Sequence, residues 1–141
     1  MKTLLTILTL ALFVSSCGKP AADKSATSAP SVQTAAPSAA GIVKEVAEAD
    51  FKTEISQGIT IVDFWAPWCK PCLIQAPIMD QIAKSSAAKV IKVNIDKAES
   101  TVNGLGIETI PTVIIFKDGV EAERFVGLTE ANEITAAIPA N

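Results

Sequence analysis

Two cysteines, Cys69 and Cys72, lie two residues apart shortly after the apolar run Ile59–Trp65. The 141-residue chain has only one other cysteine, Cys17, and it lies far upstream. A pair with this spacing can bind a metal, attach a haem, cross-link a short loop or exchange disulfides. An acidic residue, Asp63, interrupts the same apolar run, and its presence there also needs a chemical reason.

The composition of the chain weighs against most of these alternatives. The chain has no histidine, whereas structural zinc needs about four ligands and covalent haem needs a histidine directly after the second cysteine, where Leu73 stands. A disulfide across so short a loop removes little chain entropy and stabilises a fold weakly. A copper carrier is disfavoured because Met79 is the only methionine near the pair. Redox exchange is therefore the favoured chemistry.

A helix predicted to begin near Cys69 supports redox exchange. The Cys69 sulfur would face unpaired backbone N–H groups and the positive end of the helix dipole, and both stabilise the attacking thiolate. Cys72, one turn later, is predicted to be more buried and to resolve the mixed disulfide. Pro71 suits the first helical turn and fixes the geometry between the sulfurs, and Lys70 adds a nearby cation or only a solvated surface charge.

Asp63 is a candidate proton carrier. A carboxylate in an apolar strand should have a raised pKa, which suits proton transfer with the resolving thiol, although a structural aspartate is the alternative. Lys92 lies on the more polar face of the next predicted strand. We therefore expect Lys92 to lie near Asp63 as its charge partner.

Hydrophobic periodicity predicts alternating strands and helices around these residues. The predicted strands span residues 59–65, 90–95, 112–116 and 121–126, with a hairpin turn at 117–120. The predicted helices span residues 50–55, with Asp50 as N-cap, 69 onward, 99–103, and a last helix with Thr129 as N-cap and Ile134 and Ile138 on its apolar face. These elements predict an α/β fold with a central mixed sheet and helices on both faces.

The helix that begins near Cys69 contains a proline, Pro77, which should kink the helix without ending it. Its apolar side chains continue on both sides of the proline. At near-helical spacing they are Leu73, Ile74, Ile78 and Ile82.

The first 41 residues predict export and a tether. Residues 1–16 combine a positive start with a short apolar run, which is typical of a signal peptide and too short to span a membrane. Residues 14–17, VSSC, resemble the lipobox of bacterial lipoproteins, so Cys17 is the predicted lipidation site. Cleavage near residues 20–22 without lipid is the alternative. Residues 18–41, rich in Ala, Ser, Thr and Pro, predict a disordered linker to a domain at 42–141.

The motifs VDFWAPWCKPC, APIMDQIA, KVNID, TIPTVIIFKDG and FVGLT occur in this order in residues 42–141, which thereby resemble the thioredoxin family. The resemblance implies the thioredoxin fold. It also implies Cys69 as nucleophile and Cys72 as resolving residue of a redox-active disulfide, with Asp63 and Lys92 as a buried proton-handling pair. The remaining implied site residues are a cis-proline, Pro111, after Ile110, and a substrate-docking surface of Trp65, Trp68 and Gly127, although either tryptophan could serve mainly in packing.

The chain departs from cytosolic thioredoxins in two ways. Lys70 stands where they usually carry glycine, and the predicted export signal precedes the domain. Together these features predict a monomeric, membrane-anchored extracytoplasmic oxidoreductase that reduces disulfides of exported proteins. Its expected electron donor is a membrane protein with its own cysteine pair, and no cofactor is expected. An oxidase or isomerase, and a noncatalytic binding module, are the alternatives. The net charge of −3, without basic runs interleaved with aromatic residues, argues against nucleic-acid binding.

Overall fold

The computed structural model describes residues 41–140, which form a five-stranded mixed sheet in the order β1-β3-β2-β4-β5. The strands β1, β3 and β2 are parallel, whereas β4 and β5 run antiparallel to their neighbours. The strand bounds are β1 (Lys44–Glu45), β2 (Ile59–Trp65), β3 (Lys89–Asn94), β4 (Thr112–Lys117) and β5 (Val120–Val126).

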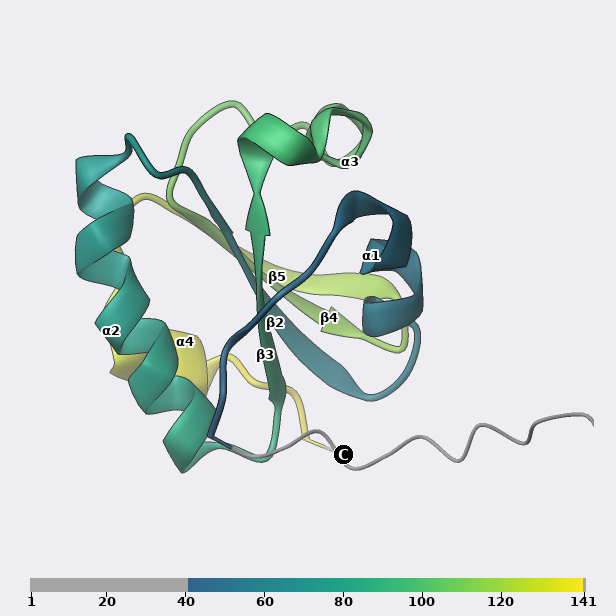
Figure 1. Ribbon diagram of the computed structural model, residues 1–141. Helices are drawn as coiled ribbons and strands as arrows, with labels where there is room; N and C mark the ends of the chain where they lie inside the picture. Colours follow the sequence, from purple (N-terminus) through teal and green to yellow (C-terminus); the bar gives the residue numbers. More distant parts are fainter. Residues whose placement is uncertain (1–40, 141) are drawn as a thin grey trace, which may run out of the picture. The chain divides into compact units, whose positions relative to one another are not determined.

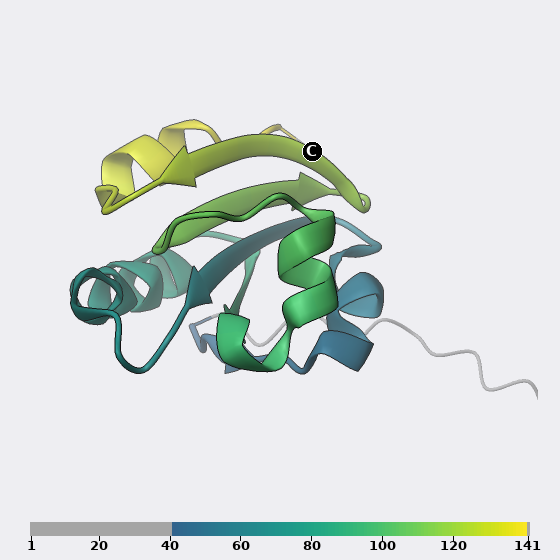
Figure 2. The same cartoon turned by 90° about the horizontal axis from the view of Figure 1, so that it is seen from above.

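Helices cover both faces of this sheet (Figures 1 and 2), as the sequence predicted. Helices α2 and α4 lie on one face, and α1 and α3 lie on the other. A short 3-10 helix, η1, follows β3. The helix bounds are α1 (Glu48–Ile55), α2 (Lys70–Ser85), η1 (Ile95–Lys97), α3 (Glu99–Gly104) and α4 (Ala131–Ala136). No helix within residues 41–140 is long and apolar enough to cross a membrane.

The central strand β2 supplies side chains to both layers of the core. Its residue Phe64 packs with Phe51 of α1, with ring centroids 6.1 Å apart, while Ile61 packs with Ile82 of α2 on the opposite face. Alternate residues of a strand point to opposite faces. Asp63 therefore shares the α2 face with Ile61.

The hairpin between β4 and β5 is confirmed at Asp118 and Gly119. Both residues have positive φ angles, 50° and 81°, which is the geometry of a type I′ turn. The Gly58 N–H donates to the Asp118 carboxylate at 2.8 Å, and the Asp118 N–H donates to the Gly58 carbonyl at 2.9 Å. These bonds fix the hairpin against the start of β2.

Two predicted helix caps are wrong. The helix α1 begins at Glu48 with Ala47 as N-cap, so Asp50 lies inside its first turn. The N-cap of α4 is Glu130 rather than Thr129, because the backbone of Thr129 is bonded to Gln75 of α2. A cap prediction considers only local partners, and here a partner 54 positions away in the sequence replaces them.

The predicted apolar face of α2 is partly wrong. Leu73 and Ile74 are 59% and 56% exposed, so they lie on the outer side of the first helical turns. The helix continues through Pro77 to Ser85, and the face it buries is Cys72, Gln75, Met79, Ile82 and Ala83. Because this face includes a polar residue, hydrophobicity alone assigned the wrong face near the start of the helix.

Two smaller differences concern the ends of the described region. The two-residue strand β1 was not predicted, because two residues are too few to show alternation. Ile138 follows α4, which ends at Ala136, although it packs on the same core as Ile134. Gly41, the first described residue, lies close to the side chain of Lys84 at the end of α2.

Candidate active site

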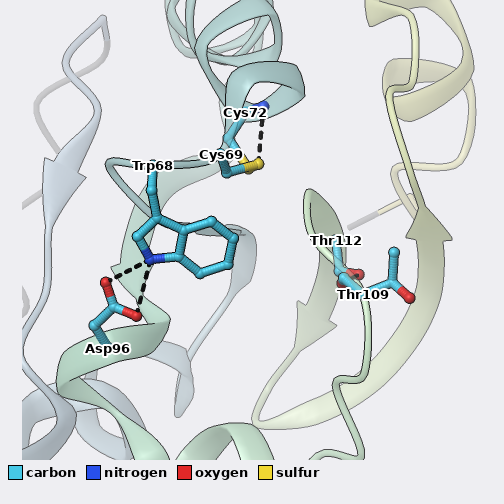
Figure 3. The surroundings of a disulfide bond; sticks show 6 residues. All are labelled: Trp68, Cys69, Cys72, Asp96, Thr109 and Thr112. Carbon is cyan, nitrogen blue, oxygen red and sulfur yellow. Dashed lines mark hydrogen bonds between the residues drawn. A yellow bond between two sulfur atoms is a disulfide. The ribbon is translucent and has the colours of Figure 1, made fainter.

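The cysteine pair lies at the N-terminus of α2 and forms a disulfide (Figure 3), with the two Cα atoms 5.3 Å apart. Cys69 is the N-cap of the helix, with an extended backbone that turns its side chain back toward the helix. The Cys72 N–H donates to the Cys69 sulfur at 3.2 Å. Both cysteines are buried. When the disulfide is reduced, this N–H can stabilise a thiolate on Cys69 through a charge-assisted bond.

Lys70 and Pro71 form the first two positions of α2, and both side chains are exposed. A proline suits this position because the first helical N–H groups have no partner within the helix. The Lys70 side chain therefore lies in solvent, on the residue that follows Cys69. Its predicted role in tuning the thiolate stays a prediction.

Asp63 is buried in β2, with 3% of its surface exposed, and its Oδ1 atom has no hydrogen-bond partner within residues 41–140. Burial raises the pKa of Asp63 to about 7, and the positive charge of Lys92 partly opposes this rise. With this pKa, the protonated and the ionised forms of the carboxyl group are both populated near neutral pH. It can therefore accept or release a proton during disulfide exchange.

Lys92 lies between two acidic residues in one row across the sheet, because it is in register with Asp63 of β2 and with Glu45 of β1. Its ammonium pairs with Glu45 at 3.6 Å and lies 4.8 Å from the centroid of the Trp65 ring. Lys97 is a second cation at Glu45, at 4.0 Å. The ion pair of Lys92 is thus with Glu45, and its effect on Asp63 is through charge.

The substitution Glu45→Gln is expected to lower the pKa of Asp63 by a fraction of a unit. Glu45 carries a negative charge and holds Lys92, so its loss removes a like charge and frees the ammonium to approach Asp63. The measurement is an NMR titration of the Asp63 carboxyl carbon in the oxidised protein. In a Lys92→Gln background the same substitution should have a smaller effect. An equal effect in both backgrounds would contradict the role of Lys92.

The two tryptophans occupy different environments. Trp65 is half-buried and packs against the cluster of Ala66, Cys69 and Cys72, with its Nε1 atom buried. Trp68 is 64% exposed next to the disulfide, and its Nε1 donates to both carboxylate oxygens of Asp96, at 3.0 and 3.3 Å (Figure 3). Trp68 is therefore available to a docking substrate, whereas Trp65 mainly supports the disulfide.

The loop before β4 also reaches the site. The Ile110–Pro111 peptide bond is cis, as the resemblance implied, and Ile110 packs against the disulfide cluster. The Thr112 hydroxyl donates to the Thr109 carbonyl at 2.6 Å, which closes the loop around Pro111. The Gly127 N–H donates to the Pro111 carbonyl at 2.8 Å. Pro111 and Gly127, far apart in the sequence, are therefore neighbours in the structure.

The sequence-based site omitted Glu45 and Asp96, which bond to Lys92 and Trp68, and Gln75, which bonds to Thr129 close to Gly127. A glutamine inside the spacing of the buried α2 residues was a usable signal, since a buried amide must find partners. Asp96 lies in the quoted motif KVNID, but its bond to Trp68 depends on the fold. Cys17, the predicted lipidation site, lies outside the described residues.

A disulfide at a helix N-terminus, a buried carboxyl on the preceding strand and an adjacent cis-proline define a thiol–disulfide oxidoreductase. The chain belongs to the thioredoxin family, because the family model described as Thioredoxin matches residues 42–140. It is therefore a thioredoxin-family disulfide oxidoreductase with Cys69 and Cys72 in its CxxC motif.

Individual relatives agree with this assignment. The chain is 36% identical to thioredoxin from Listeria monocytogenes over 99 residues, which are 69% of this chain and 96% of that protein. It is 44% identical to thioredoxin 1 from Synechococcus elongatus over 90 residues, 61% of this chain and 84% of that one. Among solved structures, a mutant thioredoxin from Halobacterium salinarum matches with a TM-score of 0.64 at 27% identity, covering 70% of this chain and 89% of that chain.

Proposed function

We propose that this protein is a membrane-tethered, extracytoplasmic oxidoreductase that reduces disulfides of exported proteins. The observation that carries the chemistry is the disulfide at the start of α2, where the Cys72 N–H faces the Cys69 sulfur. The observation that supports the location is the lipobox-like sequence at residues 14–17, followed by residues 18–41, whose richness in Ala, Ser, Thr and Pro is typical of a linker.

Reduction proceeds in two exchanges. The Cys69 thiolate attacks one sulfur of the substrate disulfide, and the substrate S–S bond breaks as the mixed disulfide forms. The other substrate sulfur leaves as a thiolate and takes a proton. The Cys72 thiol then transfers its proton to Asp63, and the resulting thiolate attacks the Cys69 sulfur. The Cys69–Cys72 disulfide forms, the second substrate thiolate leaves and is protonated, and two electrons have passed to the substrate.

The reduced pair must then be regenerated by a donor of two electrons. Because the tethered domain would not meet cytosolic reductants, we assign this role to a membrane protein with its own cysteine pair. Such a donor would attack the Cys69–Cys72 disulfide by the same exchange in reverse order. The product would be a disulfide in the donor and the dithiol form of this protein.

Lys70 supports the opposite direction as a second candidate. Its exposed cation beside Cys69 favours the thiolate of the reduced state, which makes the disulfide a stronger oxidant. Equilibration with glutathione separates the two directions. A potential near about −270 mV supports a reductase, and one near about −120 mV supports an oxidase.

The substitution Cys17→Ser is expected to release the protein from membranes, because it removes the proposed acceptor of the lipid chains. The measurement is phase partition with a mild detergent after expression in a bacterium, together with labelling by a radioactive fatty acid. The wild-type protein should carry label and enter the detergent phase, whereas the variant should do neither. The double variant Cys69→Ser and Cys72→Ser keeps Cys17 and should behave as the wild type does. An unlabelled wild-type protein in the aqueous phase would refute the tether.

A further inference from the structure

Gln75 is a fully buried polar residue on α2, one turn after Cys72. Its amide bonds to both backbone polar groups of Thr129, in the segment between β5 and α4. The Gln75 Nε2 donates to the Thr129 carbonyl at 3.1 Å, and the Thr129 N–H donates to Oε1 at 2.9 Å. A side-chain amide offers one acceptor and two donors, so it pairs with Thr129 as a neighbouring backbone would.

The hydrogen bonds continue from Thr129 to the cis-proline loop. The Thr129 hydroxyl donates to the Gly127 carbonyl at 3.1 Å, and the Gly127 N–H donates to the Pro111 carbonyl at 2.8 Å. Gly127 has a φ angle of 93°, which residues other than glycine rarely adopt. The series therefore joins α2, the segment 127–129 and the loop of Pro111.

This segment lies on the face where a polypeptide would dock. Val126 and Leu128, on either side of Gly127, are 63% and 48% exposed, and Leu73 and Ile74 at the start of α2 are exposed as well. Trp68, Leu73 and Ile74 flank the cysteines along the chain. Gly127, between Val126 and Leu128, is bonded to Pro111, whose neighbour Ile110 packs against the cysteine pair. Gln75 lies inside the molecule and cannot touch a substrate, so it can act only through the segment that it holds.

Burial of the Gln75 amide costs desolvation free energy, and packing alone does not explain why a polar residue occupies this position. The other buried residues of α2 are apolar or sulfur-containing: Cys72, Met79, Ile82 and Ala83. A buried amide is tolerated only where its groups are bonded. The backbone groups of Thr129, which is 7% exposed, need partners for the same reason.

We propose that Gln75 is a positioning residue that fixes the segment 127–129 against α2 and thereby sets the affinity for polypeptide disulfides. This inference rests on the proposed reduction of protein disulfides. Small disulfides need only the sulfur pair, so their reduction does not depend on the segment. The role of Gln75 therefore predicts different effects on large and small substrates.

The test is the substitution Gln75→Leu, with Gln81→Leu as the matched control, because Gln81 is exposed on the same helix. Reduction of insulin and of 5,5′-dithiobis(2-nitrobenzoic acid) is measured with dithiothreitol as the electron source. For Gln75→Leu we expect KM for insulin to rise about fivefold or more, with kcat within about twofold. The rate with the small disulfide should not change, and Gln81→Leu should match the wild type.

Amide hydrogen exchange tests the same inference without turnover. In Gln75→Leu the Thr129 and Gly127 amides should exchange at least about tenfold faster, while amides of β3 keep their rates. If Gln75→Leu does not fold, Thr129→Val removes only the hydroxyl bond to Gly127 and should raise KM for insulin in the same direction.

Two results for Gln75→Leu would overturn the role of Gln75. One is an equal loss of reduction rate with insulin and with the small disulfide, and the other is an unchanged KM for insulin together with unchanged exchange of the Thr129 amide. Absence of insulin reduction by the wild-type protein would instead refute the proposed function. The exchange measurement distinguishes these results, since faster exchange at Thr129 and Gly127 supports the positioning role even if insulin is not a substrate.

Discussion

The Cys72→Ser protein is expected to accumulate as a mixed disulfide with its substrates. Cys69 can still attack a substrate disulfide, but no second thiol is left on this helix turn to release the product. Steady-state reduction of insulin should fall by at least about a thousandfold, because both exchanges are needed for turnover. The measurement is non-reducing electrophoresis of cells that express the variant, followed by mass spectrometry of the bands that disappear on reduction.

The controls separate the two cysteines. Cys69→Ser should lose activity equally but form no mixed disulfides, because the N-cap position and the Cys72 N–H that stabilise a thiolate both serve the sulfur at position 69. The double variant should also form none. Trapping through Cys72 with Cys69 absent would reverse the proposed roles, and no trapped partner in Cys72→Ser cells would count against the exchange mechanism.

Asp63→Asn is expected to stabilise the oxidised protein at high pH and to have little effect near pH 4. The pKa of Asp63 is raised to about 7 by burial, whereas an unfolded aspartate has a pKa of about 3.9. The native state therefore favours the protonated form. The protonated Asp63 carboxyl group makes its full contribution to the free energy of unfolding below about pH 4. This contribution, about 4 kcal/mol, is lost as the pH rises through about 7. An asparagine has no such loss.

Urea unfolding of both proteins at pH 4, 5.5, 7 and 8.5 measures this difference. The free energy of unfolding of the variant minus that of the wild type should increase with pH and level off above about pH 8. Glu54 and Glu121 have pKa values that are lowered by bonds to Lys44 and Arg124, so they make the free energy of unfolding rise with pH. This effect is the same in both proteins and cancels in the difference. Asp80→Asn, at an exposed position of α2, should give no such trend. A difference that does not vary with pH would refute the raised pKa.

Local patterns were sufficient for most of the fold. The apolar run of β2, the helix start at Cys69 and the turn at Asp118 and Gly119 depend on neighbours in the sequence, so they were predicted close to their observed positions. The family resemblance added the cis bond before Pro111, which no local pattern requires.

The remaining errors share a cause, which is that long-range contacts decided them. Thr129 could not be recognised as a partner of Gln75, and Lys92 pairs with Glu45 on a strand that was not predicted. Leu73 and Ile74 are apolar yet exposed, because the disulfide and Gln75 occupy the inner side of their helix. Such choices depend on which surfaces meet, and the order of residues along one segment does not contain that information.

The position of Gly41 close to Lys84 has a consequence for the proposed tethered enzyme. The chain enters the domain near the end of α2, whereas the disulfide lies at the start of this 16-residue helix, about 24 Å away at a rise of 1.5 Å per residue. In the proposed tethered protein, the tether joins the domain at the end of α2 that is opposite the reactive sulfurs. The attachment therefore leaves the end of the domain that carries the sulfurs free to meet soluble exported proteins.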